Sequence, residues 1–402
     1  MNLSKLERGG GRTVLNKLAA IQRCAVLLIV GRLHSLPNNM LDMHANLLPF
    51  HLVVNKVCFQ AALRLATLPI THPLHNPVKQ VAHRFVKKHH TPLHKLMYKF
   101  KLKPELMEKI AATRQSPKWE PDMAIRIADN KEKAKEEDSR DRARTKVYTD
   151  GSGIGGQIGA VAVLYQDGVL KREKQMRLGS SKHHTVFEGE GIGLILGVEL
   201  IREEEEVEGM VTMGVDNTAA ITATHTIKPS SSHHIWDTFH QRVAMLYNKH
   251  KGADLLVKWV PSHMDILGNE KADEEAKKAA LEGLSLAVEL PAPLRKALPR
   301  SKVVTHQEFI HKLKVSVEKL WKSSPRFNGL DHLEPDIKCN NYAKLLRGLH
   351  QDWASLLFQL RTRHVLLNAF IQNTEIRFTY LCQLSATQQN STTLCATLYS
   401  AQ

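Results

Sequence analysis

Apolar residues recur at one spacing in the first third of this 402-residue chain and at another in its middle. In NMLDMHANLLPFHLVVNKVCFQAALRLATL, residues 39–68, they return every three or four positions, which is the period of an amphipathic helix. Pro69, Pro73 and Pro77 end that run. The pattern predicts a mostly helical region over residues 1–128.

A run of charged residues follows, NKEKAKEEDSRDRARTK at 130–146, and it has almost no apolar content. Such a run is typical of a linker or of an exposed helix. We expect a charged linker at 129–144 and a domain boundary there, with the choice between tether and helix left open.

Beyond residue 145, β-branched stretches alternate with helical patterns. KVYTD, IGAVAVLY and GVLKREKQMRL predict three consecutive strands, and GMVTMGVDN and LLVKWV predict two more. Helices are expected at about 187–202, at about 235–246 and from about residue 269. This order of three strands, helix, strand, helices, strand and helix predicts an α/β domain at 145–282.

The C-terminal third is less regular. Residues 283–300, GLSLAVELPAPLRKALPR, are punctuated by prolines and predict a second linker. Residues 301–402 contain one clear helical pattern, WASLLFQLRTRHVLLNAFI at 353–371, before a polar end rich in Gln, Ser and Thr. We expect a partly helical C-terminal region and leave open whether its end is degenerate.

The composition favours a polyanionic partner. The formal net charge is +16 and the pI is near 9.6, and clustered Lys and Arg gain free energy by releasing counterions from phosphate backbones. Residues 43–104 contain no Asp or Glu. This basic N-terminal segment is expected to contact nucleic-acid backbone, with an ordinary solvated basic face as the alternative.

Cysteine usage and hydropathy indicate the environment of the chain. Five cysteines, an odd number at wide spacing, favour a reducing compartment over a disulfide framework. The apolar run CAVLLIVG at 24–31 is too short to span a bilayer. We expect a soluble intracellular protein with no membrane partner; the choice between nucleus and cytoplasm and the oligomeric state stay undecided.

The stretch VYTDGSGIGG, residues 147–156, supports two interpretations. Gly151, Gly153 and Gly156 match the G-x-G-x-x-G spacing of a dinucleotide-binding loop, whereas Asp150 just before them could hold a metal ion. A dinucleotide loop must open a helix, because the helix N-terminus binds the pyrophosphate. Here the glycines lead into the strand pattern QIGAVAVLY, so a nicotinamide-dependent oxidoreductase is the least favoured alternative.

Carboxylates recur where other predicted elements end or begin: Asp150, Glu190, Asp216 and Asp273. Adjacent strands would bring Asp150 and Asp216 together. Carboxylates gathered at one end of a sheet repel one another unless divalent cations neutralise them, and oxygen ligands suit Mg²⁺ or Mn²⁺. The set predicts a metal site, although any one of these acids alone is typical of a protein surface.

Four blocks resemble, in family order, the signature of type 1 ribonuclease H: YTDGSG, TVFEGEG, GVDNTAAI and VKWVPSHMDILGNEKADEEA. The last is the most specific, because His263, Gly268, Asn269 and Asp273 reproduce the family arrangement H-x4-G-N-x3-D. The resemblance covers about residues 145–282. It implies an RNase H-like fold with a central mixed five-stranded sheet and flanking helices.

The resemblance also implies an activity, namely endonucleolytic hydrolysis of the RNA strand of RNA/DNA hybrids. The catalytic, metal-binding carboxylates would be Asp150, Glu190, Asp216 and Asp273, with two Mg²⁺ ions per site or Mn²⁺ in their place. His263 would lie on a mobile loop and move protons; a loop histidine bonded to backbone is the alternative. Hybrid recognition would read shape and RNA 2′-OH groups rather than base sequence.

Several neighbouring residues are assigned by the same reasoning. Glu188 is the rival of Glu190; because residues two apart on a helix point about 200° apart, both cannot face the metals, and the family block favours Glu190. Asn269 suits the N-cap of the last helix. Two histidine pairs are expected at the surface: His183/His184 and His233/His234.

The flanks resemble segments around the RNase H domain of polyproteins from fungal non-LTR retrotransposons. The resembling stretches are LDMHANLLPFHLVVNKVCFQAALRLATLP with HPLHNPVKQ, and QLRTRHVLLNAF; the first lies downstream of the reverse transcriptase palm in that family. The chain would then be the C-terminal part of such a polyprotein or a gene derived from one. No Y/F-A-D-D block occurs, and Cys382 and Cys395 do not supply the four ligands of a zinc site.

The helix expected around Glu190 is unusually rich in glycine, with Gly189, Gly191, Gly193 and Gly197 inside it. Each glycine costs roughly 1 kcal/mol relative to alanine, unless packing offsets the cost. The main alternative is therefore a catalytically weak or inactive nucleic-acid-binding remnant, and glycine-to-alanine replacement is expected to raise the thermal midpoint. Integrase-like transposases share the core but lack the H-x4-G-N-x3-D block, and they rank lower.

Overall fold

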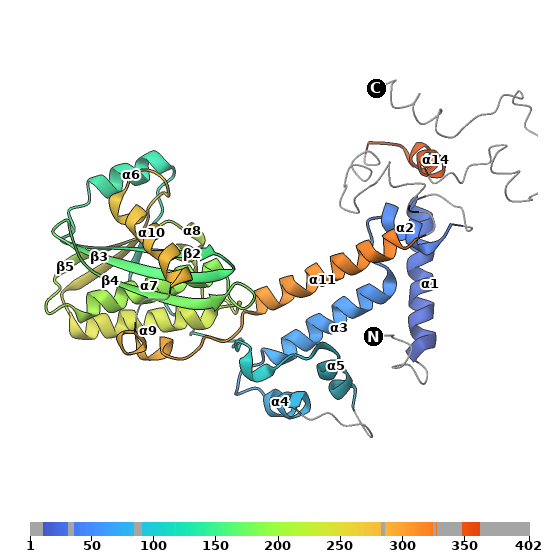
Figure 1. The fold of residues 1–402 in the computed structure, drawn as a ribbon, viewed down its shortest axis with the longest axis horizontal. Coiled ribbons are helices and arrows are strands. Elements are labelled where there is room, and N and C mark those ends of the chain that lie inside the picture. Colours follow the sequence, from blue (N-terminus) through green and yellow to red (C-terminus); the bar gives the residue numbers. More distant parts are fainter. Residues whose placement is uncertain are drawn as a thin grey trace, which may run out of the picture. The chain divides into compact units, whose positions relative to one another are not determined.

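The computed structural model describes residues 11–30, 36–83, 91–116, 118–282, 286–324, 327 and 348–361. The chain forms two compact units, one of Met1–Cys58 with Ile310–Gln402 and one of Phe59–Phe309 (Figure 1). Of the predicted features, most of HRFVKKHH, residues 362–371 of the C-terminal helical pattern, and Cys339, Cys382 and Cys395 lie outside the described residues.

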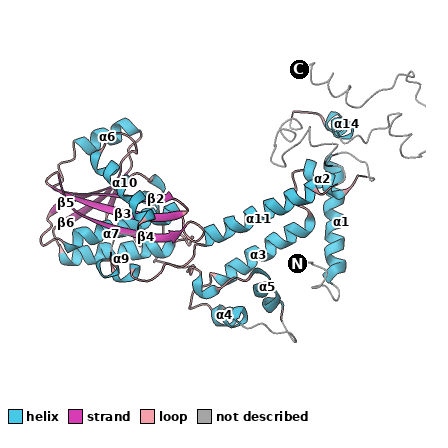
Figure 2. Ribbon diagram, viewed as in Figure 1, coloured by secondary structure: helices cyan, strands magenta, loops and turns pink. Residues whose placement is uncertain are grey.

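The larger unit is built on a mixed sheet of six strands in the order β1-β6-β5-β2-β3-β4 (Figure 2). The strands are β1 (Ala124–Arg126), β2 (Thr145–Ile154), β3 (Gln157–Gln166), β4 (Val169–Ser180), β5 (Gly209–Val215) and β6 (Ala253–Trp259). The antiparallel meander β2-β3-β4 continues through β2 into the parallel strands β5, β6 and β1. The five predicted strands are all present, and the α/β class is confirmed.

The strand count of five is wrong by one strand, β1, which lies in the region predicted to be mostly helical. Its three residues are no more than half-buried and carry no alternating pattern that could reveal a strand. Ala124 to Arg126 pair in parallel with Leu256 to Lys258. The edge of β6, rather than the local sequence, therefore induces this strand.

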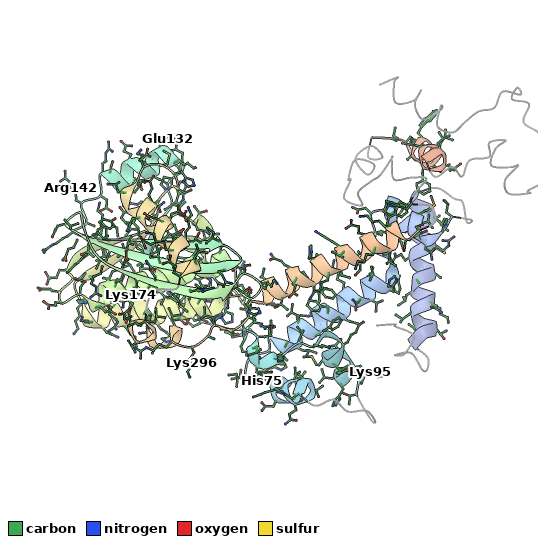
Figure 3. The ribbon with its side chains drawn as sticks, in the orientation of Figure 1. His75, Lys95, Glu132, Arg142, Lys174 and Lys296 are labelled. Carbon is green, nitrogen blue, oxygen red and sulfur yellow. The ribbon has the colours of Figure 1, made fainter. Side chains whose placement is uncertain are left out.

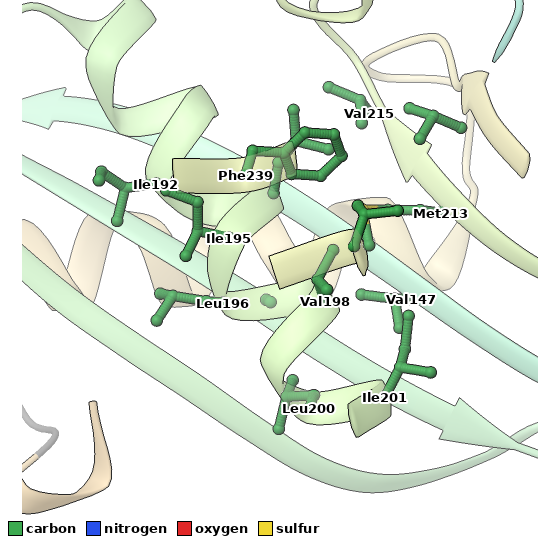
Figure 4. Packing of buried hydrophobic residues seen from close by; sticks show 14 of the residues in the cluster. Val147, Ile192, Ile195, Leu196, Val198, Leu200, Ile201, Met213, Val215 and Phe239 are labelled. Carbon is green, nitrogen blue, oxygen red and sulfur yellow. The ribbon is translucent and has the colours of Figure 1, made fainter. Parts of the chain in front are cut away.

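Helices cover both faces of the sheet. On one face α7 (Val186–Glu203) and α9 (His233–Lys249) pack with the sheet in the main hydrophobic core (Figure 4). On the other face α10 (Leu267–Leu281) buries Ala272 and Ala276 against Tyr148 and Val161. The short helix α8 (Thr218–Thr224) follows β5. The predicted alternation of apolar side chains along the strands thus supplies two separate cores.

The turn between β2 and β3 settles the glycine motif. Ile154 and Gln157 are paired, so Gly155 and Gly156 form a two-residue hairpin loop, with φ of 57° and 74°. Positive φ at both positions is the requirement of a type I′ turn, which glycine meets without steric cost. Gly151 and Gly153 lie in β2, no helix opens here, and the dinucleotide-loop interpretation fails as expected.

The charged run at 130–146 contains a helix, α6 (Lys131–Ser139), rather than a plain tether. Asp138 and Asp141 are largely buried and pair with Lys258 of β6, at 2.8 and 2.5 Å. The Tyr148 hydroxyl also donates to Asp138, at 3.2 Å. These contacts fasten the charged run to the sheet.

The proline-rich segment predicted as a second linker packs on the larger unit. It contains the 3-10 turns η3 (Ala287–Glu289) and η4 (Ala292–Leu294). Leu290 and Leu294 reach the main core, and Lys174 donates to the carbonyl of Glu289 at 2.7 Å. The apolar residues between the prolines thus make this stretch part of the core.

The larger unit also contains a helical subdomain made by the end of α3 (Phe50–Ala66), α4 (His75–His83), α5 (Pro92–Phe100), the turn η2 (Pro104–Leu106) and the start of α11 (Lys302–Lys322). Phe59 stacks on Phe309 with ring centroids 3.8 Å apart, and Phe100 meets both edge-on. The helices predicted in the basic N-terminal segment are therefore present.

The smaller unit is helical. It contains α1 (Gly11–Val30), α2 (Asn38–His44), the first part of α3, the later part of α11, and α14 (Gln351–Arg361). Trp321 and Phe358 are buried with Val26, Met40 and Leu41. Among the helices described, none is both long and apolar enough to cross a membrane.

Candidate metal centre

Three of the predicted metal ligands lie together at one edge of the sheet. Asp150, Glu190 and Asp216 each offer a carboxylate oxygen, and these oxygens all lie within 4.8 Å of one another. The register explains the meeting of the two aspartates: Thr149 of β2 pairs with Val215 of β5 in parallel, and Asp150 and Asp216 are the next residues. β5 ends at Val215, whereas β2 continues past Asp150 to Ile154; because the two strands run parallel and in this register, both carboxylates lie at the end of β5.

Glu190 joins the pair because α7 lies against β2 without an intervening side chain. A Cβ placed on Gly151 would be 2.2 Å from the backbone nitrogen of Glu190, and one placed on Gly193 would be 3.0 Å from the carbonyl oxygen of Val161. The glycines therefore permit close packing of the helix on the sheet. The contact of Gly193 with Val161 argues against the expectation that alanine would stabilise α7, because a new methyl group there would meet backbone.

The three carboxylates lie in an environment that disfavours their charged forms. Burial, with the negative charges of Asp216 and Asp273, raises the pKa of Asp150 to about 7. Burial and the charges of Asp150 and Asp216 raise the pKa of Glu190 well above its ordinary value, and burial and Asp273 raise that of Asp216. Oε2 of Glu190 is buried without a hydrogen-bond partner among the described residues. These residues fit divalent cations, whose positive charge would offset the repulsion among the three carboxylates.

Asp273, the fourth predicted ligand, lies at the margin of this group. It is on α10, and its Oδ2 accepts a hydrogen bond from Lys277 Nζ at 2.7 Å. Its side chain is 37% exposed. Its charge still acts on Asp150 and Asp216, so α10 brings it near the cluster while Lys277 holds its carboxylate.

His263 lies in the loop between β6 and α10. It is exposed, and its backbone is left-handed with φ of 58°. Its charge acts on Asp216 and opposes the rise of that residue's pKa. Among the described residues nothing hydrogen-bonds the imidazole, which disfavours the alternative of a histidine tied to backbone.

Glu188 has a different task from Glu190. It completes a capping box at the start of α7: Thr185 Oγ1 accepts from the Glu188 amide at 3.1 Å, and Glu188 Oε2 accepts from the Thr185 amide at 2.7 Å. Ser232 Oγ donates to its other oxygen at 2.9 Å. Both oxygens are thus committed to the helix start, and Glu190 is the residue that faces the aspartates.

The predicted N-cap role of Asn269 is wrong. The helix α10 begins at Leu267, two residues earlier, after Ile266. Gly268, in its first turn, packs directly on Tyr148, because a Cβ there would be 2.2 Å from the tyrosine ring. Asn269 is buried in the first turn, and its Oδ1 has no partner in the described part of the chain.

The prediction of surface histidines is wrong for one member of each pair. His184 and His233 are 6% and 5% exposed. His233 contacts Asp237 at 2.9 Å through Nδ1 and accepts from the Ala111 amide at 2.9 Å through Nε2. Asp237 lies on the same helix as His233, but Ala111 is 122 residues away, so the local sequence could not show this burial.

Asn217 is a neighbour of the site that sequence reasoning missed. Its Oδ1 accepts from the amides of Ala219 and Ala220, at 3.0 and 3.2 Å, and caps α8. Its side chain also interacts with Glu190 and opposes the rise of that residue's pKa. Its position directly after Asp216, at a strand-to-helix turn, is the signal that could have revealed it.

A second group of missed residues lies outside the predicted domain. Glu108 is 1% exposed. Its carboxylate accepts from the hydroxyl of Ser231, the amide of Ser232 and the amide of Lys302. Since Ser232 also donates to Glu188, Glu108 is linked through two side chains to the start of α7.

Arg114 fastens the loop between α8 and α9 in the same region. Its buried guanidinium donates to Asp237 at 2.7 Å and to the carbonyl of Thr226 at 2.8 Å. Together, Glu108 and Arg114 make residues 104–116 part of the unit that carries the carboxylates.

Comparisons with known proteins give low similarity throughout. No family model matches the sequence, and no curated protein matches it. Among solved structures, LC11-RNase H1 in complex with an RNA/DNA hybrid is similar at 19% identity over 35% of this chain and 99% of that one, with a TM-score of 0.28. RNase H1 from Halobacterium salinarum NRC-1 is similar at 20% identity over 34% and 96%, with a TM-score of 0.26.

A viral protein is similar over the same share of this chain. It is the foamy viral protease-reverse transcriptase in complex with an RNA/DNA hybrid, at 15% identity over 35% of this chain and 20% of that one, with a TM-score of 0.27. At these identities and scores, the likenesses decide nothing about activity.

Proposed function

We propose that this chain is an endoribonuclease that hydrolyses the RNA strand of RNA/DNA hybrids with divalent metal ions, Mg²⁺ or Mn²⁺. The observation that carries the proposal is the meeting of Asp150, Glu190 and Asp216, with oxygens within 4.8 Å, at one sheet edge. The resemblance of their sequence blocks to type 1 ribonuclease H supports the same conclusion.

The site provides acids and no nucleophilic side chain, which suits hydrolysis by water. Two bound divalent ions would activate the water and stabilise the leaving oxygen of an in-line phosphoryl displacement. Asp150, Glu190 and Asp216 would hold the ions, with Asp273 as the fourth ligand. Their raised pKa values describe the metal-free site, and a cation would restore the charged forms.

Three residues near the carboxylates would support the reaction without binding metal: His263, Asn217 and Glu188. His263, exposed and free of hydrogen bonds within the described chain, can accept or deliver a proton at the edge of the site. Asn217 holds the strand end that carries Asp216 and meets Glu190. Glu188 fixes the first turn of α7.

The basic helical subdomain is proposed to contact the nucleic-acid backbone. Four exposed lysines lie on or after its helices: Lys79, Lys95, Lys101 and Lys103. Figure 3 labels Lys95. The nearby acid Glu105 is within 3.4 Å of His83. This excess of positive charge suits phosphates. A retroelement origin of the chain is part of the proposal, on the resemblance of its flanks.

The alternative of a weak or inactive nucleic-acid-binding remnant rested on a helix loosened by glycine. The close contacts of the α7 residues Gly191, Gly193 and Gly197 with their neighbours argue against such loosening. The alternative still makes a distinct prediction, because a remnant would bind hybrid without cutting it.

The test is cleavage of an end-labelled RNA annealed to DNA, in Mg²⁺ or in EDTA, with RNA annealed to RNA as the second substrate. Wild type is compared with Asp216→Asn and with the control Asp254→Asn, an exposed acid at the other end of the parallel strands. We expect Mg²⁺-dependent cutting of the hybrid alone by wild type and the control. Binding without cutting by folded wild type would instead establish the remnant.

A further inference from the structure

Lys277 is a cation built into the margin of the carboxylate cluster. It lies on α10 one turn beyond Asp273, and its Nζ is 2.7 Å from Asp273 Oδ2. Its charge reaches Asp150 as well, where it opposes the repulsion from the other acids. Lys277 therefore acts on two of the four predicted metal ligands.

Other lysines on the same helix differ in what they contact. Lys271 pairs with Glu275 at 2.6 Å, and Lys278 pairs with Glu274 at 2.7 Å and with Glu275 at 2.8 Å. Lys277 is among the largest influences on the pKa of Asp150, and neither of these two lysines is. The pairs made by Lys271 and Lys278 are ordinary helical ion pairs at i, i+3 or i, i+4. Lys277 makes a pair of the same kind, but its partner Asp273 belongs to the predicted metal ligands.

The hydrogen bond between Lys277 and Asp273 places a positive charge beside a carboxylate that is predicted to bind metal. The pair engages Oδ2 of Asp273, and a divalent cation bound to either oxygen of that carboxylate would be repelled by the neighbouring ammonium group. Lys277 is 48% exposed and has a flexible stem, so it can turn away. The positive charge of Lys277 therefore opposes metal binding at Asp273 unless the side chain moves away.

We infer that Lys277 competes with a divalent cation for the Asp273 carboxylate and so sets the metal concentration at which the cluster fills. This inference rests on the proposed function for the identity of the site. In the metal-free chain Lys277 is a counterion of the cluster; with metal bound it is released toward solvent or a substrate phosphate. It is a positioning residue, and it acts through Asp273.

The test is a Mg²⁺ titration of the full chain followed by calorimetry, without substrate, at fixed pH and ionic strength. Lys277→Met removes the competing charge and keeps the apolar stem, Lys277→Arg keeps the charge, and Lys278→Met is the matched control one residue away. Because an exposed ion pair is weak, we expect the half-saturating Mg²⁺ concentration to fall about two- to fivefold in Lys277→Met. The half-saturating Mg²⁺ concentration should stay unchanged in Lys278→Met, and it should not fall in Lys277→Arg.

The dependence of Mg²⁺ affinity on ionic strength is a second test of the same competition. Added monovalent salt screens the lysine, so the difference between wild type and Lys277→Met should shrink as ionic strength rises. An equal change in Lys277→Met and Lys278→Met would overturn the inference in favour of a general effect of helix charge. An unchanged or weaker affinity in Lys277→Met would overturn it outright.

The same titration also distinguishes an error in the proposed function from an error in this inference. Wild type that shows no saturable Mg²⁺ binding, or binding that Asp216→Asn leaves intact, would remove the metal site and the inference together. Saturable binding lost in Asp216→Asn, with no response to Lys277→Met, would overturn the competition alone.

Discussion

Gly151 of β2 lies directly against Glu190 of α7: a Cβ on Gly151 would be 2.2 Å from the Glu190 backbone nitrogen. The glycine next to one predicted metal ligand thus determines how closely the helix carrying another can approach. The carboxylate cluster can therefore form only if α7 packs closely on the sheet.

The first prediction concerns these glycines. Gly151→Ala should lower the free energy of unfolding by more than about 2 kcal/mol, because the new methyl group meets backbone that cannot move aside. Gly197→Ala should cost less, since its nearest neighbours are the side chains of Met213 and Val147, at 2.9 and 3.0 Å.

Urea unfolding checks both variants against Gly252→Ala, where the nearest atom would be 3.6 Å away. A higher thermal midpoint for Gly151→Ala would contradict the packing described above.

The second prediction separates stability from activity at Asp216. Asp216→Asn should raise the thermal midpoint of the metal-free chain, because it removes a negative charge that raises the pKa of Asp150. The same change should lower hybrid cleavage more than about 100-fold, since a metal ligand is lost. Thermal melting in EDTA and a cleavage assay measure the two effects; a variant less stable than wild type in EDTA would argue against electrostatic strain in the cluster.

The sequence predicted the elements of the sheet well because each strand and helix has a local pattern. Alternating apolar residues identified β2, β3 and β5, and the order of Asp150, Glu190 and Asp216 along the chain predicted their cluster, although Asp150 lies inside β2 rather than after it. The short strand β1 escaped prediction, because it exists only by pairing with β6.

Residues that depend on distant partners were missed or misjudged. The burial of His233 and of Glu108 involves partners far away in the sequence, Ala111 and Lys302. The cost of the α7 glycines was misjudged for the same reason, because propensity is local while the contact of Gly193 with Val161 is not.

The third prediction concerns Glu108, which lies well before the predicted domain. Glu108→Gln should lower the free energy of unfolding by about 1–3 kcal/mol, because an amide nitrogen would face one of the donors that the buried carboxylate now accepts from. Glu105→Gln, at an exposed position three residues earlier, is the matched control. Equal stability of the two variants in chemical denaturation would show that the link from Glu108 to Ser232 contributes nothing.

The last prediction is the pH dependence of the metal-free chain. A carboxyl group whose pKa is higher in the folded state than in the unfolded state binds its proton more tightly when folded. For Asp150 the window runs from its ordinary pKa of 3.8 to about 7. Across that window the folded state holds more protons, so this group's contribution to the free energy of unfolding falls as pH rises, by on the order of a few kcal/mol. Glu190 and Asp216 act in the same direction.

Thermal melts in EDTA at a series of pH values should therefore show a midpoint that Asp150→Asn makes less sensitive to pH. Mg²⁺ should act in the opposite sense, because it binds the deprotonated carboxylates and stabilises the folded state most where they are charged. The Mg²⁺-induced rise in midpoint should thus be small at acidic pH and grow as pH approaches and passes about 7. A Mg²⁺ effect independent of pH, or one retained in Asp150→Asn, would mean that the ion binds elsewhere and that the buried carboxylates of this cluster are not its ligands.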